Sequence, residues 1–167
     1  MIGAAIGAQV LAVDINDEAL AMARRLGASA TLNPTAVGDA ALAVRDMTGG
    51  GAHVSIDGLG ITATIQNSMR SLRKLGRHVQ IGQPLGTHAA PPLPLLETVY
   101  ARQISLFGTR GIAASRFSPL LGMIAAGRLD PARMITRRIG LSEADAALRA
   151  MDGYAGVGVT VIDRMQA

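Results

Sequence analysis

The stretch Gln9-Val-Leu-Ala-Val-Asp14 reads as a buried strand that ends in an acid, and a helix expected over residues 17–26 follows at once. Asn16 is placed to cap that helix, and Gly27 stands just beyond its end. In a nucleotide-binding βαβ unit, the second strand delivers an Asp or Glu whose carboxylate binds the adenosine ribose hydroxyls and disfavours a 2′-phosphate. Asp14 is therefore a candidate ribose ligand. The alternative is that Asp14 caps the helix, but Asn16 already suits that role.

The chain lacks the segments that precede such a strand in a complete fold. It starts at Met1, inside an expected helix over residues 1–8, and neither a glycine-rich turn nor a first strand comes before that helix. We therefore expect a nucleotide-binding fold whose opening lies outside this chain.

Strands and helices alternate along the rest of the chain with short links, which is typical of βαβ units and a parallel sheet. The expected fold class is α/β, a Rossmann-like doubly wound parallel sheet that lacks its first strand. Residues 87–96 contain three prolines and are expected to form an irregular crossing or an edge segment. No linker divides the chain, so residues 1–167 are expected to form one truncated dinucleotide-binding domain. The expected strands are 9–14, 30–32, 53–57, 77–81, 103–107 and 158–163. The expected helices are 17–26, 36–47, 62–75, 119–126 and 142–151. Gly76 is expected to close the third of these helices, Ser118 to cap the fourth, and Ser142 with Asp145 to form a capping box at the start of the fifth.

The composition suits an aliphatic core and argues against several classes of protein. Apolar residues make up 49% of the chain and aromatic residues 2%, so a disordered chain is excluded and the core must be aliphatic. There is no cysteine, which excludes disulfides and thiolate ligands. The net charge of +4 comes from scattered arginines without interleaved aromatics, so no nucleic-acid partner is expected. The apolar opening is too short to span a bilayer, and we expect a cytoplasmic protein with no membrane partner.

Three expected strands end in turns that contain glycine. These turns read Asp57-Gly58-Leu59-Gly60, Ile81-Gly82-Gln83-Pro84 and Phe107-Gly108-Thr109-Arg110. Ligands of open α/β sheets bind outside the carboxyl ends of the strands, where glycine permits close backbone approach. The alternative is that these glycines serve ordinary turns. Asp57 is expected to hydrogen-bond nearby backbone or cofactor rather than to act as a catalytic acid.

The sequence offers no metal site and no catalytic pair. His53, His78 and His88 lack metal-ligand spacing, and no cysteine supports them. His53 and His78 fall at or near expected strand starts and are expected to be structural or exposed. No nucleophile stands beside a base, so no catalytic residue is assigned.

The chain resembles the carboxyl-terminal part of a zinc-dependent medium-chain alcohol dehydrogenase, from Met1 to Asp163. No single segment is decisive, and the resemblance rests on the order and spacing of all six. They are Ile6-Gly-Ala-Gln-Val-Leu-Ala-Val-Asp14, Ala23-Arg-Arg-Leu-Gly-Ala28, His53-Val-Ser-Ile-Asp-Gly-Leu-Gly60, Gly76-Arg-His-Val-Gln-Ile-Gly82, Gly127-Arg-Leu-Asp-Pro131 and Gly158-Val-Thr-Val-Ile-Asp163.

The resemblance implies a set of coenzyme-binding residues for NAD. Asp14, with Ile15 beside it, would hold the adenosine ribose, and Gly58, Leu59 and Gly60 would line the coenzyme cleft. The residues near the nicotinamide and its ribose would be Ile81, Gly82, Gln83, Leu106 and Phe107. The resemblance also implies a homo-oligomer that pairs through the sheet edge near Leu93–Leu96, and an alcohol or aldehyde substrate in the whole enzyme.

The chain departs from the family pattern in ways that weaken coenzyme binding. The family's catalytic domain, with its zinc ligands, lies amino-terminal to this region, so zinc is expected only in that missing part. The pyrophosphate loop would fall about five residues before Met1, given its usual spacing of about 20 residues from the acid. Ala19 stands where many relatives place a lysine, and Val157-Gly158-Val159 stands where some place an arginine. NAD is therefore expected to bind weakly or not at all.

Two functions from different classes follow. The first is the coenzyme-binding portion of an NAD-dependent zinc-type alcohol dehydrogenase, inactive alone. The second is a non-catalytic nucleotide-binding or dimerisation module that uses an unpaired sheet edge. An NADP-dependent reductase is disfavoured because Asp14 would repel the 2′-phosphate.

Overall fold

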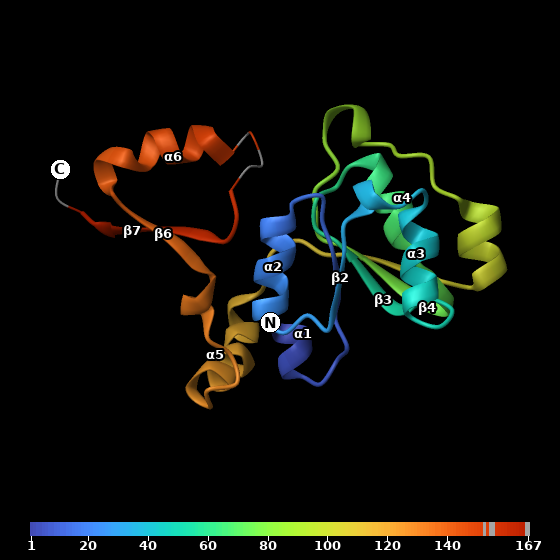
Figure 1. The fold of residues 1–167 in the computed structure, drawn as a ribbon, viewed down its shortest axis with the longest axis horizontal. Coiled ribbons are helices and arrows are strands. Elements are labelled where there is room, and N and C mark those ends of the chain that lie inside the picture. The colour runs from blue at the N-terminus through green and yellow to red at the C-terminus, as the bar shows by residue number, and fades with distance from the viewer. Residues whose placement is uncertain (152, 154–155, 166–167) are drawn as a thin grey trace. The chain divides into compact units, whose positions relative to one another are not determined.

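The computed structural model describes residues 1–151, 153 and 156–165, and the chain forms two compact units (Figure 1). Unit 1 comprises Met1–Asn33 and Ala113–Ala167, and unit 2 comprises Pro34–Ile112. The expectation of a single domain over residues 1–167 stays a prediction. No described helix is both long enough and apolar enough to cross a membrane.

The amino-terminal part of unit 1 forms a strand–helix–strand segment after a short helix, α1 (Ile2–Ala5). The strands β1 (Leu11–Val13) and β2 (Ala30–Leu32) pair in parallel around helix α2 (Asp17–Arg25). The expected cap is confirmed, because the Asn16 side chain accepts hydrogen bonds from the first turn of α2. Gly27 has a φ of +104°, and a Cβ there would lie 2.8 Å from the Cβ of Ala4, so only glycine fits.

The carboxyl-terminal part of unit 1 holds α5 (Phe117–Ala125), β6 (Ile135–Gly140), α6 (Ala144–Met151) and β7 (Val159–Arg164). Strands β6 and β7 pair in parallel. Three 3-10 turns join these elements, at Ala114–Arg116, Pro131–Met134 and Leu141–Glu143.

Two expectations for this part are wrong, and one strand was missed. Helix α5 begins at Phe117, and its cap position is Arg116, which makes no side-chain cap, rather than Ser118. The turn before α6 is closed by Glu143, whose carboxylate accepts from the Gly140 N–H at 2.9 Å, rather than by Ser142 and Asp145. Strand β6 was not expected at all.

Unit 2 contains a three-stranded parallel sheet in the order β3-β4-β5. Its elements are a 3-10 turn at Pro34–Ala36, α3 (Ala40–Met47), β3 (Ala52–Asp57), α4 (Thr62–Arg70), β4 (Leu72–Gln80), a 3-10 turn at Gly86–His88, a π-helix at Leu95–Tyr100 and β5 (Ser105–Gly108). Figure 1 shows α3 and α4 over one side of this sheet.

Two helix limits in unit 2 differ from the sequence-based expectation. Helix α3 begins at Ala40 rather than residue 36, because the Asp39 carboxylate accepts from the Leu42 N–H at 3.0 Å and so caps the helix there. Helix α4 ends at Arg70 rather than Leu75, and Gly76 lies inside β4 instead of closing the helix. Leu72 continues the apolar spacing of the helix, but its backbone pairs with Ala52 of β3.

The core of unit 2 is a small aliphatic cluster between α4 and the sheet. Ile65 and Met69 from α4 pack with Leu72 and Ile104, and each is at most 7% exposed. Deep burial of one helical stripe fixes α4 on this face of the sheet.

The strand pairings within each unit agree with those of a doubly wound sheet. In the usual order 3-2-1-4-5-6, the first strand lies between the second and the fourth. The pair β2-β1 agrees with the 3-2 part of that order, and β3-β4-β5 agrees with the 4-5-6 part. The α/β fold class with parallel sheets is therefore confirmed.

Candidate functional site

Two glycine turns of unit 2 touch each other at the carboxyl ends of β3 and β4. A Cβ on Gly82 would lie 2.5 Å from the Gly60 nitrogen, and a Cβ on Gly60 would lie 2.7 Å from the carbonyl oxygen of Gln83. Gly60 also has a φ of +84°. Larger side chains would force the two turns apart, so the glycines are required for this backbone contact.

Asp57 forms hydrogen bonds with both turns. The carboxyl group is buried, and its Oδ2 atom accepts from the Gly60 N–H at 2.9 Å. The backbone oxygen of Asp57 accepts from the N–H groups of Ile81 and Gly82, each at 2.9 Å. Asp57 thus orders backbone, as its position at a strand end predicts, and its carboxylate is fully engaged in that task.

Apolar side chains are exposed near the ends of β3, β4 and β5. They are Leu59, Ile81, Leu106 and Phe107, and space is open where a Cβ on Gly58 would stand. Exposed aliphatic and aromatic groups at the carboxyl end of a parallel sheet suit the flat face of a bound ring.

Asp14 and Ile15 lie in unit 1, in the turn between β1 and α2. The Asp14 carboxylate is exposed, and its Oδ1 atom accepts from the Asn16 N–H at 2.9 Å. Asn33 donates to the Ile15 carbonyl at 3.1 Å and to the Asp17 carboxylate at 2.8 Å, which fixes the turn. Because Asn16 caps α2, the capping alternative for Asp14 does not hold. Oδ2 of Asp14 receives no hydrogen bond from any described residue.

The ten predicted coenzyme residues therefore fall in two groups. The eight residues of unit 2 lie in the turns after β3 and β4 and at the end of β5, while the two of unit 1 lie in the turn after β1. Each assignment stays a prediction.

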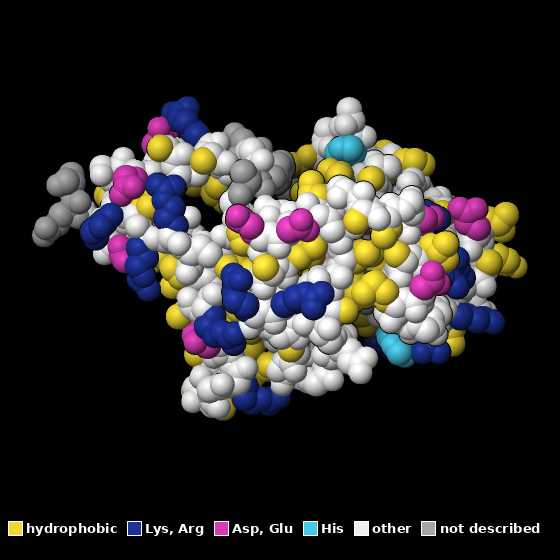
Figure 2. Space-filling model, in the orientation of Figure 1, with side chains coloured by type: hydrophobic (Ala, Val, Ile, Leu, Met, Phe, Trp, Pro, Cys, Tyr) yellow, Lys and Arg dark blue, Asp and Glu magenta, His cyan; other side chains and the backbone are white. Residues whose placement is uncertain are grey.

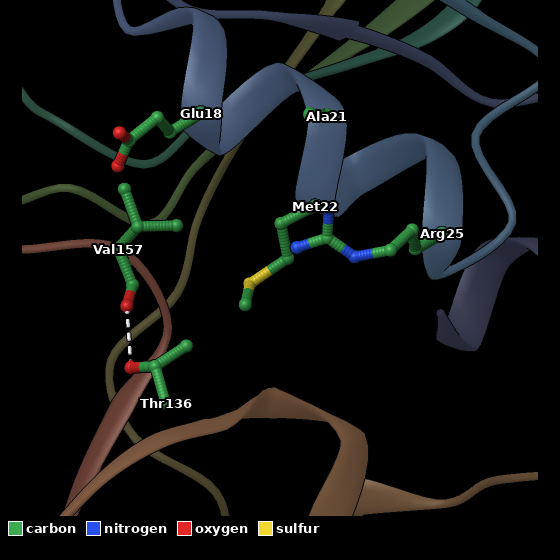
Figure 3. Close-up of a pocket in the computed structure, with 6 residues that line it drawn as sticks. All are labelled: Glu18, Ala21, Met22, Arg25, Thr136 and Val157. Atoms are coloured by element: carbon green, nitrogen blue, oxygen red, sulfur yellow. Dashed lines mark hydrogen bonds between the residues drawn. The ribbon is translucent and has the colours of Figure 1, made fainter.

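A separate hollow of about 380 Å³ lies in unit 1 (Figure 3). Its lining residues are Glu18, Ala21, Met22, Arg25, Thr136 and Val157. The Thr136 hydroxyl donates to the Val157 carbonyl at 2.6 Å, so that polar pair is already satisfied. None of the predicted coenzyme residues lines this hollow.

Charge is distributed without a metal-binding cluster. Among the described residues, no group of three His, Asp or Glu side chains is placed to hold a metal ion. On the face in Figure 2, lysine and arginine side chains lie in separate small groups with acidic side chains among them.

Three titrating groups away from the turns have shifted pKa values. The pKa of Asp39 is lowered by the hydrogen bond from the Leu42 N–H and then by Arg70. The pKa of Glu143 is lowered first by the Gly140 N–H, with Arg164 and Arg137 adding to it. Burial, followed by the nearby charges of Arg45 and Arg70, lowers the pKa of Arg102.

Sequence reasoning missed two polar residues beneath the turns, His78 and Gln80. His78 is buried within β4 at 3% exposure, which agrees with a structural role, although it lies inside the strand rather than at its start. Gln80 donates to the Asp57 carboxylate at 2.5 Å. The available signal was their spacing of two in a strand, which places both side chains on one face.

Comparisons with known proteins agree on one family. A family model described as zinc-binding dehydrogenase matches residues 1–126. A geraniol dehydrogenase from Castellaniella defragrans is 34% identical over 137 residues, which are 80% of this chain and 36% of the relative. An NAD-dependent alcohol dehydrogenase from Sulfurisphaera tokodaii is 27% identical over 156 residues, 93% of this chain and 43% of the relative.

A solved structure extends this similarity to the fold. The crystal structure of an NAD-dependent alcohol dehydrogenase superposes with a TM-score of 0.82 at 27% identity, over 95% of this chain and 45% of that one. The chain thus spans less than half the length of these relatives.

Proposed function

The chain belongs to the zinc-binding dehydrogenase family, and we propose that it is the coenzyme-binding part of an NAD-dependent alcohol dehydrogenase, inactive alone. The observation that carries the proposal is the pair of touching glycine turns, held by Asp57 and bordered by exposed apolar side chains. This arrangement occurs at the edge of a parallel sheet where nucleotides bind in doubly wound folds.

Each unit, taken separately, offers residues that suit one end of NAD. Asp14 offers an exposed carboxylate oxygen for the adenosine ribose hydroxyls, and it disfavours a 2′-phosphate at the same place. The apolar rim of Leu59, Ile81 and Phe107 would exclude water from one face of the nicotinamide. When bound, the nicotinamide accepts or gives the hydride.

This chain's own contribution to the reaction is binding and orientation. The glycine turns bring backbone close to the ring, and the Asp57 hydrogen bonds keep that backbone in place. The zinc ion and the groups that move a proton to or from the alcohol would belong to the amino-terminal part of the whole enzyme. The alcohol or aldehyde substrate and a cytoplasmic location remain part of the proposal.

The second candidate function is a non-catalytic nucleotide-binding or dimerisation module. Leu93, Leu95 and Leu96 are exposed, and they precede β5, which is an edge strand of the sheet in unit 2. An exposed apolar segment and an open sheet edge each favour self-association. Sedimentation of the wild-type chain beside Leu96→Glu tests this function, because a shift to monomer in the variant supports it.

The coenzyme proposal is tested by fluorescence titration of NADH and NADPH with the wild-type chain and with Asp14→Ala. We expect the wild type to prefer NADH and the variant to lose that preference, because the carboxylate that repels the 2′-phosphate is gone. Glu18→Ala is the matched control, since Glu18 is an exposed acid in the first turn of α2. If Asp14→Ala keeps the preference for NADH over NADPH, the assignment of Asp14 to the adenosine ribose is wrong.

A further inference from the structure

A network of hydrogen-bonded polar side chains lies next to the glycine turns of unit 2. The Ser55 and Ser68 hydroxyls lie 3.3 Å and 3.1 Å from Nδ1 of His78. Nε2 of His78 lies 3.0 Å from Oε1 of Gln80, whose Nε2 lies 2.5 Å from Oδ2 of Asp57. Ser55, Asp57 and His78 are each at most 9% exposed, and Ser68 and Gln80 are partly buried.

The hydrogen-bond partners of Gln80 fix which of its groups donates and which accepts. The Gln80 amide nitrogen faces the Asp57 carboxylate and the Gly82 carbonyl, at 2.5 Å and 2.8 Å, and both of these groups accept only. The Gln80 oxygen must therefore accept, so Nε2 of His78 carries the hydrogen. The two serine hydroxyls lie within hydrogen-bond distance of Nδ1, on the other side of the His78 ring. Both groups of the Gln80 amide have partners in this one orientation, which favours a single rotamer of Gln80.

At one end, this hydrogen-bond network reaches both glycine turns. Gln80 binds the Gly82 carbonyl directly, and it reaches Gly60 through Asp57, whose Oδ2 accepts from the Gly60 N–H. At the other end, His78 of this network contacts Ser68 of α4 and Ser55 of β3. The geometry therefore connects a helix and two strands to the two turns that form the candidate coenzyme surface.

We propose that Gln80 and His78 are positioning residues for the nicotinamide side of the coenzyme. Gln80 holds the Gly58–Gly60 turn and the Gly82 turn at a fixed separation, and His78 holds the Gln80 amide in the orientation that permits this. In this proposal both side chains act through the turns rather than by contact with the coenzyme. The inference rests on the proposed function, because it assigns a ligand to these turns.

The test compares Gln80→Met with wild type in the full chain of 167 residues. Methionine keeps the length of the side chain but removes the amide that joins the two turns. We expect amide hydrogen exchange at Gly60 and Gly82 to accelerate at least about tenfold, because hydrogen bonds to charged groups are the stronger ones. The dissociation constant for NADH should rise by a similar factor. Arg77→Met is the matched control, since Arg77 is exposed on the opposite face of β4.

His78→Leu gives a second reading if Gln80→Met folds poorly by circular dichroism. This variant frees the Gln80 amide to rotate but leaves it in place, so the same two amides should accelerate by a smaller factor. Unchanged exchange at Gly60 and Gly82 in a folded variant would overturn the positioning role. Faster exchange with unchanged NADH affinity would overturn it as well, because the turns would then not matter for the coenzyme. Absence of NADH binding by the wild type even at millimolar NADH would instead overturn the proposal that this chain alone carries a weak coenzyme site.

Discussion

The β3-β4-β5 sheet of unit 2 and the β6–β7 pair of unit 1 are both parallel, but they are stabilised in different ways. Helix α4 buries Ile65 and Met69 against the first, whereas α6 buries none of its side chains against the second. The sheet of unit 2 encloses the polar groups of Ser55, Asp57 and His78, while those of the β6–β7 pair form exposed ion pairs such as Arg138–Asp163 at 3.0 Å.

The difference bears on function. Buried hydrogen bonds hold backbone to one geometry, and exposed ion pairs contribute little because water and salt screen them. A ligand surface that depends on backbone position therefore belongs at the ends of β3 and β4. The following substitutions test this contrast.

The largest effect is expected from Leu72→Ala in the core of unit 2. Leu72 is fully buried, so its truncation should lower the free energy of unfolding by about 2–5 kcal/mol. Leu148→Ala in α6 is the control, and it should stay within about 0.5 kcal/mol because that side chain is 66% exposed. Urea denaturation of both variants measures the difference. Equal losses would remove the contrast between the two regions.

A gain is expected from Thr98→Val in the π-helix of unit 2. The Thr98 hydroxyl is fully buried and has no hydrogen-bond partner among the described residues. Replacing it with a methyl group of similar shape should raise the free energy of unfolding by about 1 kcal/mol or more. Thr98→Ser keeps the hydroxyl and loses a methyl group, so it should be less stable than wild type. Thermal melts that rank Val below wild type would show that the hydroxyl is satisfied.

A pH-dependent effect is expected from Asp39→Asn at the start of α3. The folded-state pKa of Asp39 is lowered by the Leu42 N–H and by Arg70, so the charged form stabilises the fold above the unfolded pKa. That contribution is lost as the pH falls through the folded-state value. The wild type should exceed the variant by less than about 1 kcal/mol at neutral pH, since the pair is partly exposed. Denaturation at several pH values should show this gap closing in acid; a constant gap would argue against the charge.

The smallest effect is expected from Arg138→Met on β6. Its ion pair with Asp163 is exposed, so the unfolding free energy should change by at most about 0.5 kcal/mol and the change should shrink in salt. Denaturation at low and high salt measures it. A loss above 2 kcal/mol that resists salt would mean that the β6–β7 pair depends on this contact.

The parts of the fold that were predicted correctly have signals close together in sequence. The cap Asn16 and the terminator Gly27 bracket α2 within a few residues, and β2 has the predicted bounds. Strand β6 was missed because adjacent arginines interrupt its apolar pattern, and Arg138 finds its partner Asp163 25 residues away. Helix α4 was predicted too long because Leu72 keeps the helical spacing while its backbone joins the sheet.

The candidate site shows the same division. The glycine turns were visible because glycine after a strand is a local signal. The hydrogen-bond network of His78, Gln80 and Asp57 was not visible in the sequence, because its hydrogen bonds join residues up to 23 positions apart on different elements. Their pairing depends on the register of β3 against β4, which places Asp57 opposite Gln80 and which sequence spacing alone does not give.

The most direct measurement is an NMR titration of the ¹⁵N-labelled chain with NADH. The account predicts that amide shifts change together in two groups, Asp14 with Ile15, and the turns around Gly58–Gly60 and Ile81–Gln83 with Leu106 and Phe107. Shifts confined to β6, β7 and α6, or no shifts at millimolar NADH, would contradict the claim that this chain carries the coenzyme site.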